Sequence, residues 1–201
     1  MTLRQIAFVG LLLVACWHGW QDWHLRAIHP TDGVLAPNAP LQTVALETGP
    51  VRLGRWSLTP RAHYVITARI LRREDYHFDA IADLVPEDLA LGWGRMSDNR
   101  VLAGFEIDQG ARFYSWRTRN AYWPIPREEI VAHSANTHVI PANGSLARQL
   151  GRLRIGQVVR LEGELVDGDR DDGATLRTSL TRSDSGGGAC EVLLVRQVET
   201  P

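Results

Sequence analysis

The chain has 201 residues, 44% of them hydrophobic and 22% charged, which fits one domain with a substantial core and an attached segment. The formal net charge is −1 at pH 7, so the chain as a whole has no field that attracts nucleic acid or acidic lipid. The basic residues are all arginine, which we ascribe to genome base composition and not to phosphate binding.

Residues 1–24 have the pattern of a membrane-targeting segment. Arg4 precedes an apolar run that begins at Ile6, and tryptophans follow the run as they do at membrane interfaces. We prefer an uncleaved signal-anchor, that is, a transmembrane helix. The alternative is a lipoprotein signal, whose Leu-Val-Ala-Cys sequence would place the lipid on Cys16. Both interpretations place the rest of the chain outside the cytoplasm, and the preferred signal-anchor predicts an inner-membrane protein with its domain in the periplasm.

Residues 25–55 predict an extended linker, because they are rich in proline, glycine, threonine and asparagine. The stretch VLAPNAPLQ within this linker is apolar enough to lie along the domain. We expect residues 56–201 to form a single β-rich domain outside the cytoplasm.

Alternating apolar residues predict strands, since a strand with one buried face carries an apolar side chain at every second position. In chain order we expect strands at 63–71, 101–107, 111–117, 158–166, 175–181 and 190–198. The second and third of these pair around a turn at 108–110. Helical spacing predicts a helix at 79–85, a second helical turn at 86–91 after Pro86, and a short helix starting at Gly144.

The remaining segments complete a mainly β pattern. Glycines predict a loop at 92–100, and prolines make 123–133 an irregular approach to another strand. We predict an α+β fold, predominantly β, with one or two short helices. The last third is a short-strand meander with Gly163 inside a strand, which is typical of a small curled barrel of the oligonucleotide/oligosaccharide-binding (OB) type.

The stretch HSANTHVIPAN, residues 133–143, concentrates polar side chains between apolar ones. We interpret it as a buried connector whose polar groups satisfy backbone atoms. The alternative is a polar pocket in which His133, Ser134, Asn136 and His138 meet a ligand.

The stretch SDSGGG, residues 183–188, has the Asp-Ser-Gly-Gly sequence of a serine-protease nucleophile loop around Ser185. The nearest upstream histidine in a suitable setting, His133, is too close in sequence for that fold. We therefore interpret the stretch as a glycine-rich hairpin loop. The acidic stretch at 167–173 lacks the glycine and glutamate of a calcium loop, so we expect no metal site and no cofactor.

Cys190 has no disulfide partner if Cys16 is lipidated or lies in the membrane. The sharpest enzyme hypothesis pairs its thiol with His133 or His138 as a base. The simpler interpretation is a small apolar residue at the start of a buried strand.

Aromatic and polar side chains in two segments are candidates for ligand binding. The stretch RFYSWRTRNAYW interleaves arginines and aromatics, a pattern that stacks sugars or bases, and a periplasmic location favours a glycan or protein partner over nucleic acid. The ligand-binding candidates are Trp93, Ser97, Asp98, Trp116, Arg117, Ser134 and Asn136.

Four stretches together, LALGWGRMSDNRVL, FYSWR, HSANTHVIPAN and SLTRSDSGGGACE, resemble a family of uncharacterised bacterial membrane-anchored extracytoplasmic proteins. The resemblance spans most of the chain and implies the same topology. It implies no activity.

The first functional hypothesis is a non-catalytic, membrane-anchored extracytoplasmic domain that binds a ligand or partner. The alternative is a hydrolase or thiol enzyme that uses Cys190 or Ser185 with His133 or His138.

Overall fold

The computed structural model describes residues 2–46 and 49–201. Its elements run in the order α1 (Leu3–His24), β1 (Leu41–Thr43), β2 (Val51–Leu53), β3 (Trp56–Asp75), β4 (Glu87–Gly92), the 3-10 helix η1 (Gly94–Ser97), α2 (Asn99–Leu102), β5 (Phe105–Gly110), β6 (Phe113–Thr118), α3 (Arg127–Ala132), β7 (Ser134–Pro141), α4 (Gly144–Leu150), β8 (Val158–Arg170), β9 (Thr175–Leu176) and β10 (Glu191–Glu199).

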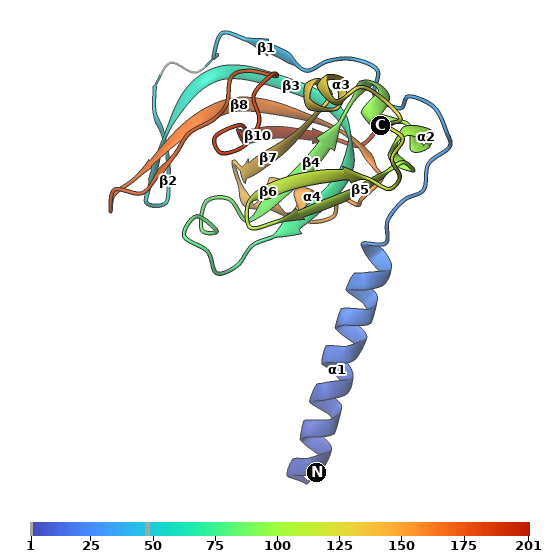
Figure 1. The fold of residues 1–201 in the computed structure, drawn as a ribbon. Coiled ribbons are helices and arrows are strands. Elements are labelled where there is room, and N and C mark those ends of the chain that lie inside the picture. Colours follow the sequence, from blue (N-terminus) through green and yellow to red (C-terminus); the bar gives the residue numbers. More distant parts are fainter. Residues whose placement is uncertain (1, 47–48) are drawn as a thin grey trace.

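Five strands pair in a closed ring in the order β3, β4, β7, β10, β8 and back to β3 (Figure 1). The pairing is antiparallel except between β7 and β10, which run parallel. Helix α4 connects β7 to β8. The predicted α+β fold, predominantly β, is thus confirmed, whereas the barrel expected from the last third of the chain is instead a ring of strands. The ring takes strands from the whole domain and not from its last third alone.

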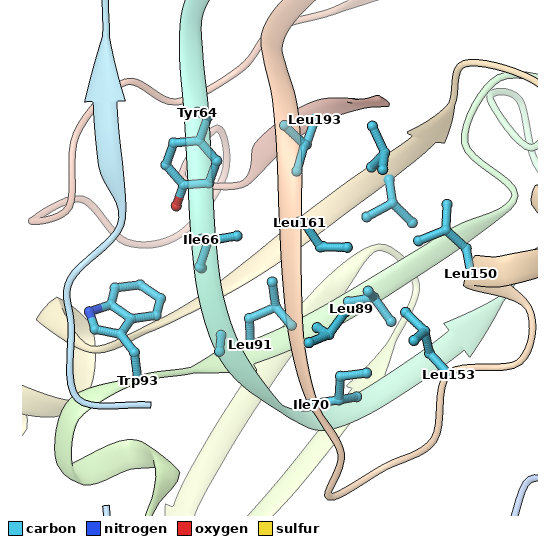
Figure 2. Packing of buried hydrophobic residues seen from close by; sticks show 14 of the residues in the cluster. Tyr64, Ile66, Ile70, Leu89, Leu91, Trp93, Leu150, Leu153, Leu161 and Leu193 are labelled. Atoms are coloured by element: carbon cyan, nitrogen blue, oxygen red, sulfur yellow. The ribbon is translucent and has the colours of Figure 1, made fainter. Parts of the chain in front are cut away.

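The main core fills the ring. Side chains at alternate positions of β3 point inward and are almost completely buried, as a period of two residues requires. Helix α4 covers one end of this interior with Leu146 and Leu150, so the predicted helix at Gly144 is confirmed. Figure 2 shows side chains from the strands and from the α4 region meeting inside the ring: Tyr64, Ile66, Ile70, Leu89, Leu91, Leu150, Leu153, Leu161 and Leu193.

Two smaller apolar clusters cover the outer face of β4, β7 and β10. One lies under the segment 76–86 and includes Val85, Ile140 and Val192. The other lies under the β5–β6 hairpin and α3 and includes Ala90 and Ile130. Polar side chains of the same three strands lie on this outer face, and they form the site described below.

The predicted helical turn at 86–91 is wrong, because residues 87–92 form strand β4. All six residues of β4 are buried, because the ring interior covers one face and the outer clusters cover the other. A strand buried on both faces does not alternate between apolar and polar residues. Its residue pattern therefore cannot be distinguished from that of a buried helical turn. The predicted helix at 79–85 is also wrong: the chain makes a single turn there, with Val85 N bonded to Ile81 O at 2.8 Å.

Four other local predictions differ from the structure. Residues 127–132 form helix α3, which acidic residues in its first turn favour. The β5–β6 turn is centred on Ala111 and Arg112, whose φ angles of 49° and 68° are those of a tight hairpin turn. The predicted strand at 175–181 is reduced to β9, and the predicted connector at 133–143 contains the central strand β7.

The segment predicted as a linker is held against the domain. Strands β1 and β2 pair with β3, and Ile28 N donates to Ile155 O at 2.7 Å. Ser97 Oγ accepts hydrogen bonds from the backbone nitrogens of Leu35 and Ala36, and Asp98 accepts one from Gly33 N. Side chains of the domain therefore fix the path of residues 28–36.

Helix α1 extends away from the ring (Figure 1). Among the described residues, no helix combines the length and the apolar character that crossing a membrane requires. The predicted transmembrane helix is therefore not supported. Polar residues in the last two turns of the helix shorten its apolar stretch.

Candidate functional site

A pocket of about 140 Å³ lies between the β5–β6 hairpin, α3, the start of β7 and the loop 181–190. Trp93, Phe113 and Trp116 line its aromatic part. Its polar lining includes Asn136 and Cys190, together with Ser185 from the loop. The pocket thus joins the two polar stretches that the sequence analysis singled out.

The parallel pairing of β7 and β10 explains why these stretches meet. Thr137 lies opposite Glu191 and His138 opposite Val192, so Asn136 and Cys190 are neighbours at the start of the pair. Alternate residues of a strand share a face, and Val139 belongs to the ring interior. Asn136 and His138 therefore face outward, on the same side as Cys190.

His138 connects the pocket wall to a buried carboxylate. Its Nδ1 lies 2.7 Å from Asp88 Oδ1. The neighbouring Cys190 side chain is close enough to stabilise the protonated imidazole. Burial lowers the pKa of His138, but the bonds to Asp88 and Cys190 outweigh it and raise the pKa to about 9.

Arg112 neutralises the carboxylate side of this cluster. One guanidinium nitrogen lies 3.0 Å from Asp88 Oδ1, and Nε lies 2.8 Å from Asp79. The guanidinium carbon lies 3.7 Å from the centre of the Tyr76 ring, a cation–π contact. Asp88 is completely buried, so the arginine and the histidine are what make its charge tolerable.

Asn136 is held in one orientation by three neighbours. Its Oδ1 accepts from Gln109 Nε2 at 2.6 Å, and its Nδ2 donates to Arg112 O at 3.1 Å. The same Nδ2 lies 3.5 Å from Cys190 Sγ. The thiol in turn lies 3.9 Å from Arg112 O, so the left-handed turn at Arg112 brings a backbone acceptor to both side chains.

Ser134 lines another side of the pocket, and the preceding residue, His133, does not line it. Ser134 Oγ donates to Ile130 O at 2.7 Å and accepts from Tyr114 at 3.2 Å. His133 Nδ1 contacts Glu129 O at 2.9 Å, and its ring packs edge-on against Trp93. Among the described residues, His138 is the histidine that reaches Cys190.

The loop 181–190 forms the outer wall of the pocket. Its Arg182 makes an ion pair with Glu191, and also donates to Tyr64 at 3.2 Å and to Gln42 at 3.2 Å. Burial raises the pKa of Glu191 to about 7, although Arg182 opposes the shift. Ser185 lines the pocket without a histidine partner in the part of the chain that the structure describes.

Several predicted residues have other roles. Ser97 and Asp98 bind the segment 33–36, as described above, and so their oxygens face the chain itself. Arg117 is exposed on the hairpin and pairs with Glu106. Cys16 is exposed on α1.

Sequence reasoning missed Asp88, Gln109 and Arg112. The available signal for Asp88 was an acidic residue within the apolar run PEDLALG, which was interpreted as a helical turn. Gln109 and Arg112 were assigned to a turn and a strand, with no indication that they reach β7.

Comparisons with family models, with curated proteins and with solved structures found no match to the chain.

Proposed function

We propose that the domain binds a small, mainly apolar ligand group in the pocket beside Cys190. The pocket itself carries this proposal: a cavity of about 140 Å³ with an aromatic side and a polar side. A cavity of about 150 Å³ lined by apolar side chains holds a benzene molecule, so this one fits a single ring or a short branched chain.

The lining determines how such a group would lie. Trp93 and Trp116 offer flat apolar surfaces, and Phe113, 55% exposed, stands at the mouth. Ser134 and Asn136 provide a hydroxyl and an amide on the polar side. Pockets that combine apolar walls with a few convergent polar groups are the usual sites of small ligands. A ring with one hydroxyl, such as phenol, matches both sides.

Phenol is therefore the first probe, followed through tryptophan fluorescence, since two tryptophans line the pocket. Ala189 also lines the pocket, so Ala189→Leu fills the space that phenol needs. We expect saturable binding by the wild type and at least roughly tenfold weaker binding by Ala189→Leu, about 1.4 kcal/mol. Ala147→Leu, on the exposed face of α4, is the matched control. Equal binding by wild type and Ala189→Leu, or no saturable binding, contradicts the proposal.

The proposal includes a location outside the cytoplasm, which rests on Arg4 and the apolar run after it. Alkaline phosphatase fused after Pro201 is expected to be active. Activity of a cytoplasmic reporter at the same position, with an inactive phosphatase, contradicts this location. Palmitate labelling that disappears in Cys16→Ser would identify the attachment as a lipid.

A further inference from the structure

We infer that Cys190 is the nucleophile of an acyl-transfer site, with His138 as its base and Asp88 as the residue that orients the histidine. The three side chains come from the adjoining strands β4 and β7 and from the residue that precedes β10. Asp88 lies 2.7 Å from His138 Nδ1, and the register of β7 and β10 places His138 on the same outer face as Cys190, close enough for the two side chains to interact. A nucleophile, a base and an orienting carboxylate in this order are what covalent acyl transfer requires.

The three side chains become more buried from Cys190 through His138 to Asp88. Cys190 is half-buried and lines the pocket, whereas His138 is 6% and Asp88 0% exposed. A ligand in the pocket therefore meets the sulfur first, and the base and carboxylate lie behind it. A cysteine kept only for packing needs no neighbouring histidine that a carboxylate orients.

The charged neighbours maintain the ionised carboxylate. Arg112, from the β5–β6 turn, bonds to Asp88 at 3.0 Å and is itself paired with Asp79 and stacked on Tyr76. The Asp88 carboxylate, held by Arg112, stabilises the positive charge of the protonated His138.

Asn136 supplies a donor for the substrate. Its Nδ2 lies 3.5 Å from Cys190 Sγ, and Gln109 fixes the amide orientation through a bond of 2.6 Å to Oδ1. A carbonyl whose carbon bonds to the sulfur places its oxygen within reach of such a donor. Asn136 thus provides one hydrogen bond to the oxygen on which negative charge develops.

The chemical steps balance with water as the second reactant. The Cys190 thiol loses its proton to water, and the resulting thiolate, stabilised by the protonated His138, attacks the carbonyl carbon of an ester and forms the carbon–sulfur bond. The carbon–oxygen bond of the ester breaks, and the leaving alcohol takes the proton from His138. Water then loses a proton to the neutral His138 and attacks the thioester, the carbon–sulfur bond breaks, and the thiolate is restored beside the protonated histidine. The products are a carboxylic acid and an alcohol.

The substrate class follows from the pocket, and this part of the inference rests on the proposed ligand site. The cavity of about 140 Å³ beside the sulfur accepts a short or single-ring acyl group and excludes a long chain. Esters of small apolar acids are therefore the substrates, whatever the alcohol part is. The reactivity of the thiol depends on its hydrogen bonds and not on ligand binding, so the two proposals fail in different experiments.

The first experiment measures alkylation of Cys190 by iodoacetamide at pH 7, followed peptide by peptide in the full chain. The reference is the same cysteine in the chain unfolded in urea, where it reacts as an ordinary thiol with a pKa of about 8.5. We expect the folded chain to react roughly tenfold faster despite the partial burial, because a thiolate is the reacting form. Slower reaction in the folded chain overturns the inference.

Two histidine variants identify the base. His138→Gln is expected to bring the folded rate down to the unfolded rate or below it and to move the rise of the rate with pH up toward the ordinary thiol pKa of about 8.5. His133→Gln is the control, because this half-buried histidine contacts Glu129 and Trp93. Circular dichroism shows whether His138→Gln is folded. If it is folded and its alkylation rate equals that of wild type, the role of this histidine is contradicted.

The second experiment tests transfer itself with p-nitrophenyl acetate and p-nitrophenyl octanoate. We expect a burst of p-nitrophenolate from the acetate, a mass gain of one acetyl group on the Cys190 peptide, and no burst in Cys190→Ser. The octanoate should acylate far more slowly. Absence of acetylation on Cys190 overturns the acyl-transfer site. Equal acylation rates with both esters overturn the proposed substrate class. Ala189→Leu should slow acylation but leave alkylation by the smaller iodoacetamide fast.

Discussion

Asp88 and His138 occupy opposite positions in the register of β4 and β7, and their side chains meet at 2.7 Å on the outer face of the ring. A shift of one residue between these strands would turn Asp88 into the apolar interior and separate it from both His138 and Arg112. Breaking a buried ion pair costs about 3–5 kcal/mol, so the cluster specifies the register of the ring as well as the chemistry of the pocket.

Asn136→Ala is expected to lower stability. The substitution leaves Gln109 Nε2 without its acceptor and Arg112 O without its donor in a region where Asn136 is 5% exposed. Unpaired buried groups of this kind cost about 1–3 kcal/mol, which lowers the melting temperature of a domain of this size by about 2–6 °C. Thermal unfolding followed by circular dichroism measures the change.

The exposed Asn120 provides the control, because Asn120→Ala removes the same atoms outside the cluster. Asn136→Ser should recover part of the loss, since a hydroxyl replaces one of the bonds of the amide. A melting temperature equal to that of wild type in Asn136→Ala would contradict the structural role and leave Asn136 with a ligand-binding role alone.

The strands with one buried and one polar face were predictable from the sequence. The alternation at 63–71 and at 158–166 corresponds to β3 and β8, in which every second side chain points into the ring. The strand β4 was not predictable from alternation, because apolar clusters cover both of its faces. Periodicity reports burial on one side of an element, and it fails where both sides are buried.

Half of the candidate site was predictable as well. His138 and Cys190 were named from their residue types, and Asn136 from its position in a polar stretch. Asp88 and Arg112 were not, because they reach the site from β4 and from the β5–β6 turn through pairings that no local pattern encodes. Long-range partners depend on strand order, which the single sequence does not contain.

Gly163→Ala is expected to destabilise the ring. A Cβ at this position would lie 2.0 Å from Leu194 O, a backbone atom of the paired strand β10 that has no flexible end to move. Overpacking of this kind costs about 1–3 kcal/mol, and a contact with backbone is at the upper end of that range. Gly110→Ala is the control, because nothing lies within 4 Å of its added Cβ. Equal urea midpoints for the two variants would show that β8 and β10 are not packed this closely.

Ser97→Ala is expected to release the segment 33–36 from the domain. Ser97 is completely buried, and its hydroxyl accepts from Leu35 N at 3.0 Å and from Ala36 N at 3.1 Å. Losing this acceptor leaves both amides unpaired, at a cost of about 1–3 kcal/mol. Hydrogen exchange of these two amides should accelerate, while Ser115→Ala, at an exposed position, should leave them protected. Equal protection in both variants would contradict the proposed attachment.

Stability is expected to fall as pH rises from about 5 to about 9, because three buried groups keep protons in the folded state that they lose in the unfolded one. Burial raises the pKa of Glu87 to about 8 and that of Glu191 to about 7, from 4.5 for each. The bonds to Asp88 and Cys190 raise the pKa of His138 from 6.5 to about 9 against the effect of burial.

All three pKa shifts make the free energy of unfolding decrease as pH rises. Below about pH 4.5, folded and unfolded states both hold the two glutamate protons, and below about pH 6.5 both hold the histidine proton. Above these values the unfolded chain releases protons that the folded chain retains, so the free energy of unfolding decreases with pH. For each group the decrease ends once pH exceeds the pKa in the folded state.

Urea unfolding at pH 5, 7 and 9 measures this dependence, and the expected total change is on the order of a few kcal/mol. Glu191→Gln removes the contribution between about pH 4.5 and 7, so its stability should fall less over that interval than that of wild type. His138→Gln should lose the decrease between about pH 6.5 and 9 and keep the one at lower pH. A wild-type free energy of unfolding that rises from pH 5 to pH 9 would mean that folding does not raise the pKa values of these side chains. The cluster around His138 would then be solvated.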